Sequence, residues 1–192
     1  MAKSCGSCTL CCKLMDIDEL DKQPGAWCSA CKPGVGCRIY DDRPEGCRVF
    51  SCQWLFEEDM PDNYRPDRTK VVLSCAEGPV LIANCDPANP LAWKNEPIYS
   101  LLKHRARTHW FGIVAVVARA GQRMWAIGAN SDTDLGMVDP RSPLQFDPLP
   151  GGDVRVTVTP PLSEEEHAAQ VLALKVRAAA GRTADQEGGI SN

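Results

Sequence analysis

The 192-residue sequence has no histidine before His104 and carries none of the common enzyme motifs. A Walker A loop, GxGxxG, GxSxG and HExxH are all missing, which excludes the most easily recognised enzyme classes. A basic excess is missing too, because the formal net charge is −4, so a nucleic-acid partner is not expected. These absences leave catalytic residues unknown and favour a role other than catalysis.

Long apolar runs are also absent. The longest, from Trp110 to Ala118, is far too short to span a bilayer. The residues before Cys5 lack the apolar stretch of a signal peptide. We therefore predict no membrane association and a cytoplasmic location, where thiols stay reduced and clustered cysteines are more often ligands or redox groups than disulfides.

Cysteine is what the sequence has in excess, with eleven in all and nine between residues 5 and 52. Three C-x2-C steps occur among these nine, and such a step lets two sulfurs close on one ion. All-sulfur coordination selects zinc, iron–sulfur or Cu(I) over hard cations. A reduced thiol array or a disulfide knot is the alternative. The expected metal ligands are Cys5, Cys8, Cys11, Cys12, Cys28, Cys31, Cys37, Cys47 and Cys52.

Cys11 and Cys12 are adjacent, and adjacent side chains project in different directions. They are not expected to bind a single tetrahedral ion together. Either one of them is spare, or the segment holds more than one metal or a polynuclear cluster.

Arginines interleave with the later cysteines. Four thiolates around zinc carry a net charge of −2, so nearby cations would help to hold them. We expect Arg43 and Arg48 to surround the ligands in this way. For Arg43 and Pro44, a solvated turn before Cys47 is the alternative.

Composition divides the chain into three parts. Residues 1–56 predict a cysteine-rich metal-binding module with short helices or turns near 11–15 and 45–50, and with too few aliphatic residues for a core of its own. Residues 57–180 predict a small α+β region, and residues 181–192 a disordered tail.

Hydrophobic periodicity within 57–180 predicts strands at 70–75, 79–84, 112–118, 123–127 and 154–159. A helix is expected to run from Asn95 through Arg105, and another from the capping box Ser163–Glu166 to Gly181. Residues 132–152 are expected to be loop. The predicted fold class is α+β: a loop-rich cysteine module packed on a small, mostly antiparallel sheet with two helices. Cys75 and Cys85 are expected to be buried as small apolar residues.

The cysteine spacing resembles that of a known family. The pattern Cys5-x2-Cys8-x2-Cys11-Cys12, then Trp27-Cys28-x2-Cys31, Gly36-Cys37, Arg43-Pro44-x2-Cys47 and Phe50-x-Cys52-x-Trp54 is similar to the CxxCxxCC, or YkgJ-type, cysteine cluster family. That family is described as zinc- or iron-chelating, and a related cluster in flagellin lysine methylases resembles an iron–sulfur site. The resemblance implies a ligand set of the same cysteines, with Cys28 or Cys31 as one member. It assigns no activity to residues 57–192.

Two hypotheses of function follow. In the first, the cysteines bind zinc or iron as a structural or metal-handling module, and the α+β region contacts a protein partner. In the second, the chain is an iron–sulfur-dependent enzyme or redox component related to the flagellin lysine methylases. Cys5-x2-Cys8-x2-Cys11 partly matches the ferredoxin run, although the fourth cysteine and the proline of that run are missing.

Overall fold

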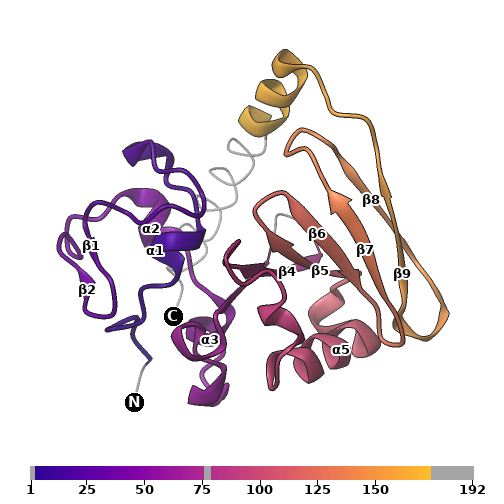
Figure 1. Ribbon diagram of the computed structural model, residues 1–192, viewed down its shortest axis with the longest axis horizontal. Coiled ribbons are helices and arrows are strands. Elements are labelled where there is room, and N and C mark those ends of the chain that lie inside the picture. Colours follow the sequence, from indigo (N-terminus) through magenta and orange to yellow (C-terminus); the bar gives the residue numbers. More distant parts are fainter. Residues whose placement is uncertain (1–2, 76–78, 174–192) are drawn as a thin grey trace, which may run out of the picture. The chain divides into compact units, whose positions relative to one another are not determined.

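The computed structural model describes residues 3–75 and 79–173 (Figure 1). Contacts divide the chain into two compact units, of which the first comprises residues 1–138 with 146–156 and the second residues 139–145 with 157–192. The helices of the first unit, short 3-10 turns (η) included, are α1 Cys11–Leu14, η1 Asp18–Leu20, α2 Glu45–Val49, α3 Gln53–Phe56, η2 Asp62–Tyr64, α4 Pro66–Thr69, η3 Ala92–Lys94, α5 Ile98–Thr108, η4 Trp110–Gly112 and η5 Pro150–Gly152. The strands are β1 Cys31–Lys32, β2 Gly36–Cys37, β3 Val71–Cys75, β4 Val80–Cys85, β5 Ala115–Ala120, β6 Arg123–Ile127, β7 Asp132–Met137, β8 Leu144–Pro148 and β9 Val154–Val158.

A five-stranded sheet in the order β3-β4-β5-β6-β7 forms the centre of the first unit (Figure 1). Three of its pairs are antiparallel, with Val72 opposite Asn84 and Ala118 opposite Trp125. The β4–β5 pair is parallel, with Ile82 opposite Val117. Parallel strands need a crossover, and here α5 supplies it. The sheet is therefore mixed, although mostly antiparallel.

Apolar side chains bury both faces of this sheet. On one face, the indole of Trp93 is fully buried, lies 5.8 Å from the ring of Trp125, and packs with Leu102 of α5 in the main core. On the other face Val72 and Val117 are also buried, at no more than 1% exposed. Strands covered on both faces have near-continuous apolar sequences, which explains why the four strands β3 to β6 could be predicted from the sequence.

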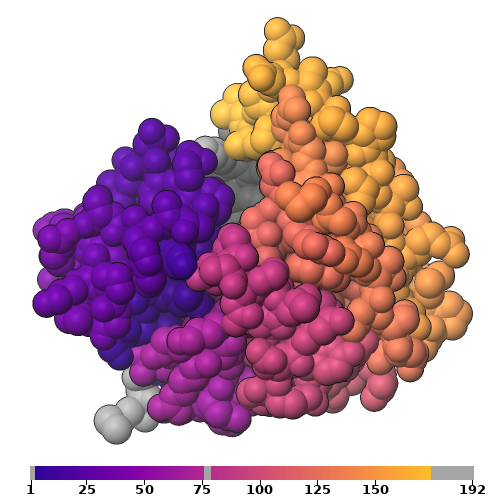
Figure 2. Space-filling model, viewed as in Figure 1, coloured from indigo at the N-terminus to yellow at the C-terminus, as the bar shows by residue number. Residues whose placement is uncertain are grey.

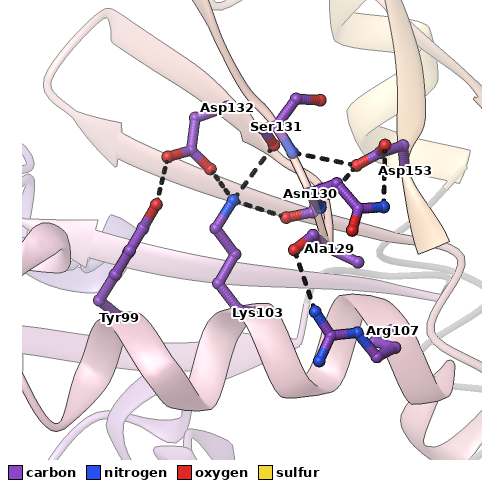
Figure 3. Close-up of polar contacts among 9 residues, drawn as sticks. Tyr99, Lys103, Arg107, Ala129, Asn130, Ser131, Asp132 and Asp153 are labelled. Carbon is purple, nitrogen blue, oxygen red and sulfur yellow. Dashed lines mark hydrogen bonds and ion pairs between the residues drawn. The ribbon is translucent and has the colours of Figure 1, made fainter. Parts of the chain in front are cut away.

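Helix α5 is tied to the turn after β6 by a polar cluster (Figure 3). Lys103 donates to the carbonyl of Gly128 at 2.8 Å and pairs with Asp132, whose other oxygen accepts from Tyr99 at 2.9 Å. Asp153 accepts from two backbone N–H groups of the same turn, at 3.0 and 3.2 Å. Lys103 and Asp132 form an ion pair, and the Asp153 carboxylate accepts hydrogen bonds from backbone N–H groups, as expected of a structural clamp rather than a reactive site.

The predicted α+β class is confirmed, and every predicted strand has a counterpart. The prediction of loop over 132–152 is wrong, because β7 and β8 lie there. Strand β7 escaped prediction because it lies at the edge of the sheet and is largely exposed, so its sequence is polar rather than apolar. Strands β8 and β9 form a separate two-stranded sheet.

The second unit includes the helix predicted to begin at the capping box. Ser163 Oγ accepts from the backbone N–H of Glu166 at 3.2 Å, while the Glu166 carboxylate accepts from the N–H of Ser163 at 2.9 Å. This reciprocal pair confirms the capping box. The helix is described over residues 164–173, so its predicted end at Gly181 and the predicted tail 181–192 lie outside the described residues.

In the described part of the chain, every helix is too short or too polar to cross a lipid bilayer. The two cysteines of the sheet differ. Cys85 is 3% exposed in the main core, as predicted, whereas Cys75 is exposed, so the prediction that it is buried is wrong. Cys75 is the last residue of β3, where the strand leaves the core.

Candidate metal centre

Tight turns present the N-terminal cysteines. The backbone N–H of Cys8 donates to the carbonyl of Cys5 at 2.8 Å, and that of Cys31 donates to Cys28 at 3.0 Å. Strands β1 and β2 then place Cys31 directly opposite Cys37. Two of the three C-x2-C steps are thus closed turns, the local geometry that lets neighbouring sulfurs share an ion. In the space-filling view the indigo and purple N-terminal segment forms one continuous mass (Figure 2).

The folded segment encloses a cavity of about 550 Å³ whose wall carries most of the predicted ligands. The remainder of the wall is largely apolar and includes Ile17, Ile39 and Phe50. Leu20 and Tyr40 border it as well and are 39% and 46% exposed, so one side of the cavity faces solvent. The eight cysteines on the wall are Cys5, Cys8, Cys11, Cys12, Cys28, Cys37, Cys47 and Cys52.

Cys31 is the predicted ligand that the cavity wall does not include. It is 9% exposed and lies in a buried cluster with Cys28, against which Cys12 packs. It therefore lies beside two of the thiols that line the cavity.

The sulfurs also serve as the packing core of this segment. A small buried cluster consists of Ile17, Cys28 and Cys31, with Cys12 and Cys47 packed against it. A single aliphatic residue in this cluster gives little apolar burial, and small domains of this kind depend on cross-links or metal for stability.

All eleven cysteines are free thiols. Burial raises the pKa of Cys5, Cys47 and Cys52 above the ordinary value of 9.0, and neighbouring thiols raise it further. Burial also raises the pKa of Cys31 to about 11. The hydrogen bond with Cys11, together with burial, raises the pKa of Cys12 most strongly. Without a cation among them, these sulfurs hold their protons at neutral pH.

One of the two predicted arginines lies beside the thiols. Arg43 borders the cavity, and its guanidinium stacks 4.0 Å from the Tyr40 ring centroid. Its hydrogen bond with Tyr40 raises the pKa of Arg43, and the thiols of Cys5 and Cys47 raise it further. This position fits the predicted role of Arg43 beside the ligands. Arg48 differs: it is exposed and donates to the carbonyl of Arg43 at 2.8 Å, so it holds the loop rather than facing the thiols.

Lys22 is a functional candidate that sequence reasoning missed. It is only 7% exposed, and its ammonium donates to the carbonyls of Lys13 and Met15. Burial lowers the pKa of Lys22, while the thiol of Cys28, with those of Cys12 and Cys11, raises it. No sequence spacing signals this role, because a lysine between two polar residues reads as solvent-exposed.

Polar contacts fasten the cysteine segment to the sheet. Lys13 pairs with Asp86, which follows β4. Arg65, immediately before α4, donates to Ser7 at 2.9 Å and to the carbonyl of Cys5 at 3.3 Å. Arg65, which lies outside the cysteine segment, therefore holds the turn that begins at Cys5. The spacing of the cysteines does not predict this contact.

The donor chemistry of the cavity fits zinc, iron or a cluster of thiophilic ions, since its coordinating groups are thiols within an apolar wall. As placed, however, no three Cys, His, Asp or Glu side chains among residues 3–75 and 79–173 are grouped tightly enough to hold an ion. The thiols line the wall of the cavity and do not converge on one point. A bound ion therefore requires the sulfurs to move inward.

No protein-family model, curated protein or solved structure matches this chain. The resemblance to the CxxCxxCC family therefore remains a prediction from the cysteine pattern itself.

Proposed function

We propose that the cysteine-rich module predicted over residues 1–56 binds zinc or iron through the cavity thiols, as a structural or metal-handling module of the kind that the CxxCxxCC resemblance implies. One observation carries the proposal: eight free thiols from distant parts of the segment border a single cavity. Separate surface thiols would not need a shared cavity, and a disulfide knot would leave the sulfurs paired.

Electrostatics supports the same proposal. Raised pKa values show that burial opposes thiolate formation in the absence of metal. A divalent ion removes this penalty, because it favours the deprotonated sulfur that ligates it. When bound, the ion supplies a multivalent cross-link between turns that otherwise share little apolar contact. Arg43 and Lys22 would offset the remaining negative charge.

The location and partners follow as further parts of the proposal. A reducing cytoplasm would keep the eleven thiols free for metal. The α+β region, whose chemistry offers no second ligand set of this kind, would contact a protein partner.

An iron–sulfur enzyme or redox component is the second candidate. The cavity volume of about 550 Å³ favours it, because a single four-coordinate ion would fill little of that space. The solvent-facing side at Leu20 and Tyr40 would give a small molecule access to a cluster. The relatedness to flagellin lysine methylases implied by the cysteine pattern points the same way.

Metal analysis of anaerobically purified protein, combined with thiol alkylation, tests the proposal. We expect stoichiometric metal, protection of the cavity cysteines from alkylation, and continued reactivity of exposed Cys75. Colourless zinc protein supports the first candidate, and a brown protein with sulfur-to-iron charge-transfer absorption supports the second. Cys8→Ser and Cys47→Ser should lose metal, whereas the control Cys75→Ser should not. Fresh protein that contains no metal and cannot be reconstituted contradicts both candidates.

A further inference from the structure

The cavity cysteines are not equivalent, because four of them also border a second, much smaller cavity of about 20 Å³. Its other lining residues are apolar: Trp54, Leu55, Pro66 of α4 and Val72 of β3. The space is about that of one water-sized site, and therefore of one ion. The four cysteines are Cys5, Cys8, Cys11 and Cys52.

The other four lining thiols, those of Cys12, Cys28, Cys37 and Cys47, border only the large cavity. Cys28 lies in a buried cluster with Ile17 and Cys31, and Cys12 and Cys47 pack against that cluster. Strand pairing places Cys37 opposite Cys31.

The two groups meet at the first turn of α1. Cys11 borders both cavities, whereas Cys12 borders only the large one and contacts Cys31. Consecutive helical residues point about 100° apart, so neighbouring cysteines can serve separate sites. Cys11 and Cys12 can therefore ligate two separate ions, although they are not expected to bind a single tetrahedral ion together.

The surroundings of the groups differ as well. Trp54 is 6% exposed and Val72 is fully buried, so α3 and β3 shield one side of the small cavity, while its four cysteines also border the large cavity. Lys3 donates to the carbonyl of Trp54 at 3.0 Å, and Arg65 braces the Cys5 turn. The large cavity, by contrast, has the exposed side chains of Leu20 and Tyr40 on its rim.

We propose that the cysteines form two distinct thiolate sites: a single-ion site against the sheet, of Cys5, Cys8, Cys11 and Cys52, and a second site that faces only the large cavity, of Cys12, Cys28, Cys37 and Cys47 with Cys31 beside it. This inference rests on the proposed metal binding and refines it. Once its four sulfurs move inward, the site against the sheet takes one tetrahedral divalent ion such as zinc, held for stability. The second site exchanges its metal with solution.

Titration with Co²⁺ tests this division, because tetrahedral thiolate cobalt absorbs visible light and the ion substitutes for zinc. We expect wild-type protein to bind two equivalents, and a chelator to remove one of them quickly and the other slowly. Cys47→Ser should lose the fast equivalent, and Cys52→Ser the slow one, with Cys75→Ser as the matched control. Near-ultraviolet circular dichroism of the Trp93–Trp125 pair checks that the sheet remains folded.

Should Cys52→Ser not fold, Cys52→His keeps a metal-binding nitrogen at the position. It should then shift the cobalt spectrum of one equivalent and leave the other unchanged. Loss of both equivalents in either serine variant, or release of all metal in one phase, would overturn the division and leave metal binding standing. Wild-type protein that takes up no cobalt, zinc or iron would instead remove the proposed function itself.

Discussion

Metal uptake by the cysteine cavity should release protons, so the affinity should rise steeply with pH. The pKa values of Cys5, Cys47 and Cys52 lie above 9.0, and that of Cys31 is about 11. In metal-free protein at pH 6–7 these thiols are protonated, and each ligating sulfur must lose its proton. A four-thiol site therefore gives an association constant that rises roughly 10⁴-fold per pH unit, or about 5 kcal/mol.

The sign is fixed by the direction of the pKa shifts. Because the pKa values of the thiols are raised, metal-free protein holds its thiol protons tightly, and acid favours the metal-free form. Protons stop competing with the metal for the sulfurs only when the pH passes the raised pKa values. The free energy of unfolding of metal-free protein should instead fall as the pH rises. The raised pKa of Cys31 contributes stability that is fully present below pH 9.0 and is lost as the pH rises through about 11.

Competition against a chelator of known conditional affinity at two pH values would give the slope, and an indicator dye in weakly buffered solution would count the protons. About four protons per ion are expected for full thiolate ligation. A carboxylate site, already deprotonated above pH 6, would release almost none. An affinity that is flat between pH 6 and 7 would therefore refute the reasoning that buried thiols are the ligands.

Three further outcomes can be checked directly. Gly152→Ala should lower the free energy of unfolding in urea by roughly 2–5 kcal/mol, because the φ of Gly152 is +85° and a Cβ would lie 2.7 Å from the Cα of Arg107. The control Gly112→Ala has a similar φ but open space around it, so it should cost only about 1–2 kcal/mol. Equal costs for the two variants would rule out the close contact. Arg43→Gln should weaken metal binding about tenfold by chelator competition, since it removes a cation beside the Cys5 and Cys47 thiols; unchanged affinity would mean that this charge does not act on the site. Cys75 should react with an alkylating reagent at the same rate before and after metal loading, because its side chain is exposed and borders neither cavity; protection by metal would place it among the ligands.

Several elements could be predicted because their signals are local. The strands that became β4 and β5 are runs of apolar residues, and the Ser163 capping box depends on side chains three residues apart. The prediction that sulfur atoms would be the metal donors also needed only the composition and the absence of histidine before residue 104. Edge strand β7 could not be predicted in this way, since its polar sequence reflects exposure rather than loop structure.

The sequence by itself determined which donor groups a metal could find in this segment, because cysteine count and C-x2-C spacing are covalent properties of the chain. Only tertiary structure decided which thiols share a cavity, since Cys8, Cys28 and Cys52 lie far apart in the sequence. Tertiary structure also buried Lys22 beside the thiols, and it placed β5 parallel to β4 through the α5 crossover. Burial and long-range pairing depend on residues distant in sequence, so no local pattern could have specified them.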